Sequence, residues 1–147
     1  MRFTTDTSVR RLRWVMVCTM LFDFCITLAG QPSSYWHHPH TVREGNGFFR
    51  YFFSHGLSAF ILAMLVYISV VFFLVSILPR RLALVSIFAF IFGHYYGASG
   101  WLEYYWHFGI NAPIIYGIIL GVVFVQLAFS TPDKKKTKNL LSDDPAA

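Results

Sequence analysis

Residues 49–78, FRYFFSHGLSAFILAMLVYISVVFFLVSIL, form the longest apolar run of the chain. After Arg50, only His55 and a few serines interrupt it. As a single helix, rising about 1.5 Å per residue, it is longer than the roughly 30 Å hydrocarbon core of a bilayer, so we expect it to tilt or protrude. Pro79, Arg80 and Arg81 end the run. So short a turn places the next helix antiparallel beside it.

Three further apolar segments flank this run, and each is long enough to cross a bilayer as a helix. We expect four spans, at about residues 14–30, 51–78, 82–102 and 112–130. The first could also be a signal peptide, but Asp23 lies inside it and no clean small-x-small cleavage site follows, which favours a retained helix. The sequence predicts an all-α integral membrane protein, an antiparallel bundle of four transmembrane helices over residues 1–131. We expect residues 132–147 to be a disordered cytoplasmic tail.

The composition and the distribution of charge support this assignment. The 147 residues are 56% hydrophobic, 19% aromatic and 13% charged, with a formal net charge of +5. Basic residues gather at the ends of the apolar runs, so the lipid bilayer is the expected partner and nucleic acid is not. Four spans place both termini and the Pro79 turn on one side, with most of the basic residues, whereas Arg43 and Arg50 lie on the other. This asymmetry predicts a multi-pass protein of the cell membrane with both termini cytoplasmic.

Pairs of glycines four residues apart occur in the last two spans. Gly93 and Gly97 lie in the third span, and Gly117 and Gly121 lie in the fourth. Small residues at this spacing let helix backbones approach closely. We expect these faces to pack the two helices together, or one face to bind another copy of the chain or a larger membrane complex.

Ionisable residues inside the spans are the candidates for chemistry. Counted along the helices, Asp23, His55 and His94 lie at a similar depth. A charged Asp near the bilayer centre costs about 2.5–3.5 kcal/mol, so we expect Asp23 and His94 to interact. Such a pair could be a proton or metal site, or a neutral Asp23 could simply join helices by hydrogen bonds. With Glu103, these residues form the candidate intramembrane polar site.

A histidine-rich loop between the first two spans is the candidate metal site. His37, His38 and His40, with Glu44 or His107, could bind zinc or copper. The spacing matches no established ligand signature, which favours a solvated loop and no required cofactor.

The stretch Gly97-Ala98-Ser99-Gly100 resembles the GxSG nucleophile motif of rhomboid intramembrane serine proteases. The resemblance covers these four residues. Those proteases have at least six spans and place the partner histidine on a later helix, whereas the last span here contains no histidine. His94 is on the same helix as Ser99 and faces about 140° away from it. Close packing is therefore the favoured role of these glycines, because a serine without a positioned base is a weak nucleophile.

Three functions remain open on the sequence. Small size and minimal loops favour a non-catalytic accessory subunit or scaffold. A proton- or metal-linked transporter would use Asp23, His55 and His94, and a membrane enzyme would work at an outer-leaflet site of Asp23, Glu103 and the histidines. No nucleotide-binding or metalloprotease motif supports the enzyme.

Overall fold

The structure, a computed structural model, describes residues 7–129, apart from the side chains of Tyr104 and Tyr105. This part of the chain is helical and contains no strand. The predicted tail, residues 132–147, lies outside the described residues. The helices are α1 (Thr7–Ala29), α2 (Gly47–Ser54), α3 (Leu57–Ile77), α4 (Arg80–Gly100) and α5 (Asn111–Ala128), with 3-10 turns at Ser33–Trp36 and Pro39–Thr41 and a π-helical turn at Trp101–Tyr105.

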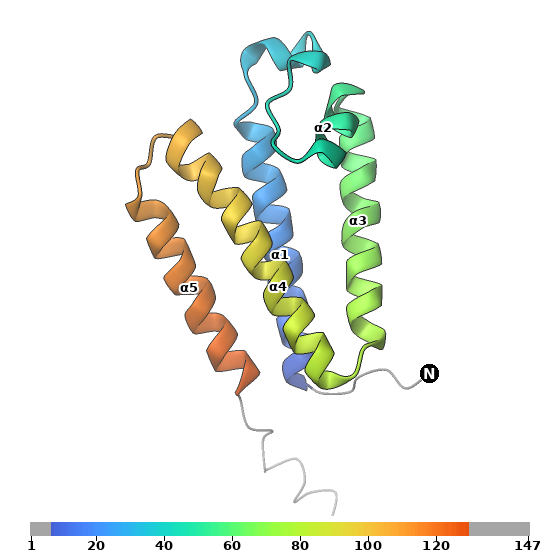
Figure 1. Ribbon diagram of the computed structural model, residues 1–147, viewed down its shortest axis with the longest axis vertical. Helices are drawn as coiled ribbons and strands as arrows, with labels where there is room; N and C mark the ends of the chain where they lie inside the picture. The colour runs from blue at the N-terminus through green and yellow to red at the C-terminus, as the bar shows by residue number, and fades with distance from the viewer. Residues whose placement is uncertain (1–6, 130–147) are drawn as a thin grey trace, which may run out of the picture.

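Four of these helices are long and apolar enough to cross a membrane: α1, α3, α4 with its continuation to Glu103, and α5. The described chain is thus an all-helical bundle with four candidate membrane spans, as the hydropathy pattern predicts. The start of α1, the α3–α4 turn and the end of α5 lie at one end, which we call the terminal end (Figure 1). The segments between α1 and α3 and between α4 and α5 lie at the other, the loop end.

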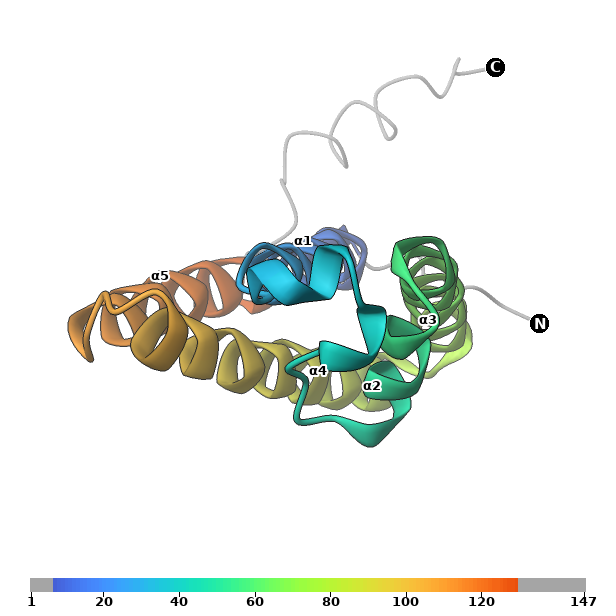
Figure 2. The same cartoon turned by 90° about the horizontal axis from the view of Figure 1, so that it is seen from above.

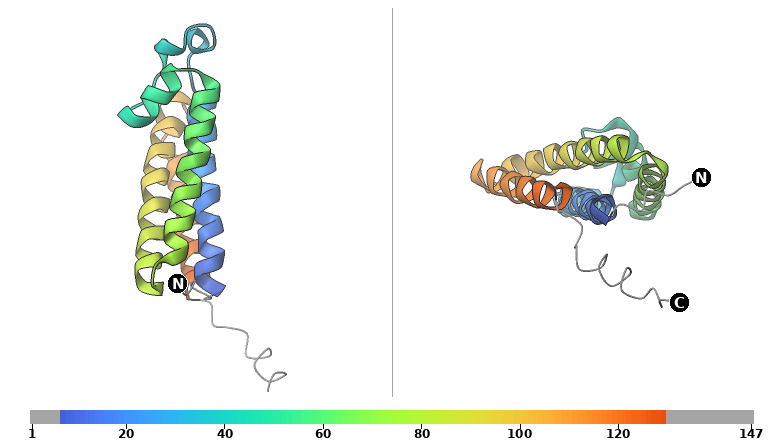
Figure 3. Two further views of the ribbon diagram at one scale, coloured as in Figure 1. Left: turned by 90° about the vertical axis from the view of Figure 1, so that its right-hand side faces the viewer. Right: turned by 90° about the horizontal axis from the view of Figure 1, so that it is seen from below.

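Helices α1 and α4 form the most extensively packed pair and occupy the middle of the bundle. Seen from above, α3 and α5 lie at opposite ends of an elongated outline (Figure 2). The segment from Ser33 to Ser54 sits above the bundle, as the side view in Figure 3 shows, and its helix α2 lies next to the upper end of α3 (Figure 1). This segment faces α4 at the loop end.

The predicted span at 51–78 is wrong in its first part, because the chain breaks between α2 and α3. Ser54 Oγ and His55 Nδ1 both donate to the Tyr51 carbonyl, each at 2.7 Å, and so end α2. Gly56 then has φ 102°, a conformation that glycine adopts without a Cβ penalty. The first helix also begins earlier than predicted, at Thr7, and includes the basic residues Arg10, Arg11 and Arg13.

Two clusters fill the interior. Near the loop end, aromatic rings pack edge to face, and Phe60 stacks on Phe53 with ring centroids 3.6 Å apart. Toward the terminal end the core is aliphatic, with Leu12, Met16 and Ile87 each fully buried. Arg13 closes that end, because its guanidinium donates to Ser76 and lies 5.1 Å from the Phe72 ring centroid. These contacts join α1 to α3.

The two cysteines of the chain, Cys18 and Cys25, are both exposed. Cys18 and Cys25 are seven residues apart and share one face of α1. The buried side chains Met16, Met20 and Phe24 occupy the opposite side of the helix. The exposed face of α1 is therefore apolar, as lipid contact requires.

Candidate functional site

Asp23 of α1 and His94 of α4 meet inside the bundle. His94 Nδ1 lies 2.8 Å from Asp23 Oδ2, and the two side chains are 10% and 14% exposed. The predicted contact is therefore present. An ionised carboxylate can only accept, so in that state His94 Nδ1 carries the proton. The contact joins the two central helices of the bundle.

The far side of the His94 ring faces a third helix. The hydroxyl of Tyr67, on α3, lies 3.4 Å from His94 Nε2. With Nδ1 protonated, Nε2 is the acceptor and Tyr67 the donor. The rings of Phe24 and Tyr67 lie 5.4 Å and 5.9 Å from the imidazole. Asp23, His94 and Tyr67 thus form a polar connection through three helices, enclosed by aromatic rings.

Gly97 makes room for the Asp23 carboxylate. A Cβ built on Gly97 would lie 3.0 Å from each carboxylate oxygen, tighter than an ordinary contact. Gly117 similarly accommodates Tyr95, whose hydroxyl would lie 2.9 Å from an added Cβ. By contrast, added Cβ atoms at Gly93 and Gly121 would meet nothing within 4 Å. The last two spans do contact each other, as expected, and Gly117 lies where α5 meets Tyr95 of α4, whereas Gly97 makes room for Asp23 of α1.

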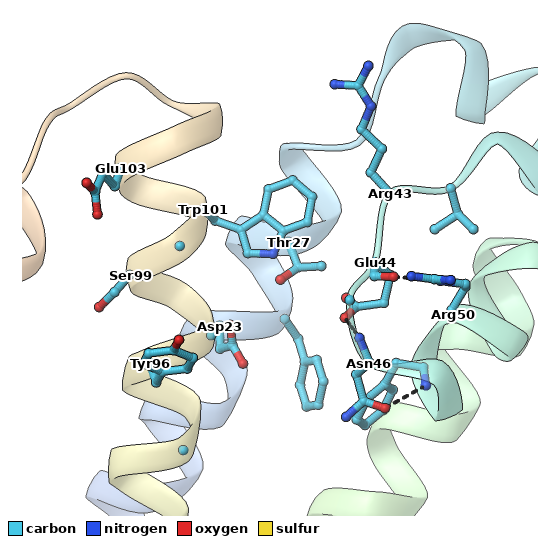
Figure 4. A pocket seen from close by; sticks show the side chains of 17 residues that line it. Asp23, Thr27, Arg43, Glu44, Asn46, Arg50, Tyr96, Ser99, Trp101 and Glu103 are labelled. Atoms are coloured by element: carbon cyan, nitrogen blue, oxygen red, sulfur yellow. Dashed lines mark hydrogen bonds between the residues drawn. The ribbon is translucent and has the colours of Figure 1, made fainter.

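Asp23 lies at the floor of a cavity of about 990 Å³ at the loop end. One wall is the face of α4 that carries Gly93, Gly97 and Gly100, and the opposite wall is the segment 42–50 (Figure 4). All three acidic residues of the described part of the chain, Asp23, Glu44 and Glu103, belong to its lining, although the Glu103 side chain is directed away from the loop wall (Figure 4). We call it the loop-end cavity.

Gln31 holds the loop wall in place. Its side chain is buried, and Nε2 donates to the carbonyl oxygens of Thr27 at 3.1 Å and of Arg43 at 2.8 Å. Its Oε1 accepts from the Arg43 backbone N–H at 2.8 Å. This two-way contact fixes the backbone just before Glu44 to the end of α1. Trp101 packs beside it, because Gly30 leaves space that a Cβ would fill, at 2.5 Å from the indole.

Glu44 and Asn46 are fixed by hydrogen bonds within the loop. The Asn46 backbone N–H donates to Glu44 Oε1 at 2.7 Å, and Asn46 Oδ1 caps α2 by accepting from the N–H groups of Phe48 and Phe49. Arg50 Nε donates to the Glu44 carbonyl at 2.7 Å. Burial raises the pKa of Glu44, and the negative charge of Asp23 raises it further. The hydrogen bond from the Asn46 backbone N–H and the positive charge of Arg50 lower this pKa in part. The loop therefore places a half-buried carboxylate close enough to Asp23 for the two negative charges to repel each other.

Of the two remaining residues predicted for the polar site, one lies at the cavity and one does not. Glu103 lines the loop-end cavity. His55 does not belong to the site, because it is exposed and contacts Tyr51 and Ser54 at the end of α2. Its predicted depth assumed that residues 51–78 form one straight helix, and the break at Gly56 removes that assumption.

The histidines proposed as metal ligands are not brought together. His37, His38, His40 and His107 are all exposed. Within residues 7–129, no group of three or more His, Cys, Asp or Glu side chains could hold a metal ion. His107 has φ 53° and lies in the α4–α5 connection, away from the first loop. The structure therefore favours the solvated-loop interpretation of this sequence.

Ser99 lacks the geometry of a nucleophile. Its hydroxyl donates to the Tyr95 carbonyl of its own helix at 2.7 Å, and the Nδ1 of His94 is engaged by Asp23. The short resemblance to the rhomboid motif thus has no catalytic pair behind it in the described residues.

The sequence analysis did not assign Thr27 or Asn46 to the site, considered Glu44 only as a metal ligand, and did not identify Gln31 as the residue that holds the loop wall. A usable signal was present, since Thr27 lies four residues after Asp23 and Gln31 four after Thr27, on one helical face.

Compared with known proteins, the chain matches no family model, no curated protein and no solved structure. Its function therefore has to be inferred from the cavity itself.

Proposed function

We propose that this protein is a multi-pass membrane protein that binds a polar ligand in the loop-end cavity. The observation that carries this proposal is the cavity of about 990 Å³ into which the carboxylates of Asp23 and Glu44 are directed (Figure 4). Ligand sites in proteins are commonly cavities of about 300–1,000 Å³ with a few convergent polar groups. Carboxylates among apolar helices are costly to keep unless they are used.

The cavity ends at the level of Asp23 and Gly93, and this favours binding over conduction. Its lining contains no residue closer to the terminal end on α1 or α4. Beyond that level the interior is filled by fully buried side chains, among them Leu12, Met16 and Met20. A transporter built on the same site would need this core to move, and an enzyme would need an additional reactive group. Binding needs neither.

The orientation we propose places the loop end outside the cell and both termini in the cytoplasm. Among the described residues, five arginines lie at the terminal end, namely Arg10, Arg11, Arg13, Arg80 and Arg81, and two at the loop end, Arg43 and Arg50. Basic residues are retained preferentially on the cytoplasmic side of a membrane. The cavity would then open to the outer leaflet and the outside.

A bulky side chain placed in the cavity should exclude the ligand. Two glycines, one in the cavity lining and one outside it, provide a matched pair for this test. Gly93 lines the cavity and Gly121 does not, yet both are exposed helical glycines with nothing within 4 Å of an added Cβ. We expect Gly93→Phe to lower the occupancy of a co-purified ligand by about tenfold or more, because it fills the site, and Gly121→Phe to leave it unchanged. Native mass spectrometry of the full chain released from membranes measures this. Equal adducts on all three proteins would overturn the proposed function.

Orientation can be measured by labelling from outside intact cells. In a Cys18→Ser, Cys25→Ser background, we expect Asn46→Cys to react with a membrane-impermeant maleimide. Arg81→Cys should react only after the membrane is opened, because it lies at the opposite end of the bundle. Labelling of Arg81→Cys alone in intact cells would reverse the proposed orientation.

A second candidate function, an accessory subunit or scaffold, is favoured by α5. Only 11% of the residues of α5 are buried within the chain, compared with 39% of the residues in the most apolar part of α1. Such a face suits lipid, another copy of the chain or a partner helix. A photo-crosslinking residue at Ile118, which is 61% exposed, should capture a protein neighbour if this role is correct. Crosslinking to lipid alone would exclude it.

A further inference from the structure

The side chains that face into the loop-end cavity differ from those at its rim. Figure 4 shows Asp23, Thr27, Glu44 and Asn46 directed into the space between α4 and the loop, with the Arg43 guanidinium directed away from the two carboxylates. Asp23 uses Oδ2 for His94, and within the described residues no hydrogen bond engages its Oδ1. Two carboxylates therefore face the interior of the cavity. The positively charged side chain beside them is Arg50, whose Nε donates to the Glu44 carbonyl. This arrangement selects for positive charge.

Thr27 is an independent indication of a ligand. It is 4% exposed, yet its hydroxyl has no hydrogen-bond partner among the described residues. Thr19, on the same helix and equally buried, donates to the carbonyl of Val15 at 2.9 Å. Thr27 lines the loop-end cavity, so a group bound there can donate a hydrogen bond to its hydroxyl.

Aromatic rings complete the lining. Phe24 and Phe49 lie near the floor, and Trp101 and Tyr96 line the α4 side. Their faces can cover the alkyl part of a ligand and attract its positive charge. The cavity thus combines carboxylates, a spare hydroxyl and aromatic rings.

Resting on the proposed function, we propose that the ligand carries a primary ammonium group, which donates to the carboxylates of Asp23 and Glu44 and to the Thr27 hydroxyl. Three N–H donors of an ammonium match these three acceptors. The alkyl carbons beside the nitrogen then lie against the aromatic rings. A small soluble amine and the ethanolamine headgroup of a phospholipid share this chemistry, and the outer-leaflet opening suits either.

The ligand side of the test uses charged and neutral probes of similar size. We expect ethanolamine to raise the melting temperature of the full chain in detergent and ethylene glycol, with a hydroxyl in place of the ammonium, to leave it unchanged. In nanodiscs, phosphatidylethanolamine should remain bound in native mass spectrometry at least about tenfold more than phosphatidylglycerol, if the source is lipid. A shift with ethanolamine alone assigns the ligand to soluble amines, and retention of phosphatidylethanolamine assigns it to lipids.

The protein side separates this inference from the proposed function. Glu44→Gln and Thr27→Val should each weaken ammonium binding, Glu44→Gln by about tenfold or more, while Arg81→Gln at the other end of the bundle should not. Equal responses to ethanolamine and ethylene glycol, with phosphatidylethanolamine and phosphatidylglycerol bound alike, would overturn the ligand class, as would ammonium binding unchanged by Glu44→Gln. If Gly93→Phe still removed a co-purified ligand in that case, the cavity would remain a binding site for another kind of molecule.

Discussion

Replacing Phe60 by alanine should lower the free energy of unfolding by about 3 kcal/mol or more. Phe60 is 1% exposed and stacks on Phe53, and its ring also contacts those of Phe24 and Phe49. Alanine would leave a void where α1, α2 and α3 meet. Within a bilayer, packing contacts rather than water exclusion hold helices together, so lost contacts are not recovered elsewhere. Unfolding by denaturing detergent, followed by circular dichroism, measures the loss.

Phe73 provides the matched control on the same helix. It is 55% exposed, so the alanine substitution exchanges one apolar surface for another and lipid fills the space. We expect a change well below that at position 60. Equal losses for Phe60→Ala and Phe73→Ala would mean that the aromatic cluster does not stabilise the junction of α2 with the bundle.

The number of candidate membrane spans could be predicted from the sequence, because the length of an apolar run is a direct signal. The four runs are separated by Pro79, by the Pro- and Gly-rich loop before Gly47, and by the connection before Pro113. The break at Gly56 could not be read in the same way. Hydrophobicity is continuous across it, and one glycine inside an apolar helix is ordinarily tolerated. What ends α2 is local: two side chains compete for the Tyr51 carbonyl, and φ at Gly56 is positive.

The candidate site was predictable only where depth alone decides the contact. Asp23 and His94 lie on two helices that both run from the terminal end to the loop end, so counting residues back from their loop-end termini brought them to one level. The loop wall was not predictable, because Glu44 reaches the cavity through the contact of Gln31 with the Arg43 backbone. Such contacts depend on how the chain turns between α1 and α2. No periodic pattern encodes that path.

Separating Asp23 from His94 should produce a large and non-additive loss of stability. His94→Phe keeps a planar ring among Phe24 and Tyr67 but removes both ring nitrogens, leaving the Asp23 carboxylate without its partner. Breaking a buried pair from one side typically costs about 3–5 kcal/mol. Asp23→Asn should cost less, because a neutral amide can be buried more cheaply than a lone charge. The double variant should therefore be more stable than the sum of the two single losses implies.

The size of this coupling decides whether the pair exists in the folded protein. We expect a coupling energy of at least about 1 kcal/mol between Asp23→Asn and His94→Phe, because the two side chains share a hydrogen bond. His55→Phe is the control, since His55 is exposed at the end of α2 and should combine additively with Asp23→Asn. Additivity within about 0.5 kcal/mol for His94 as well would mean that the two do not touch. The cavity would then lack its floor, and Asp23 would have to be held by some other group, because a carboxylate at this depth does not stay unpaired without a cost.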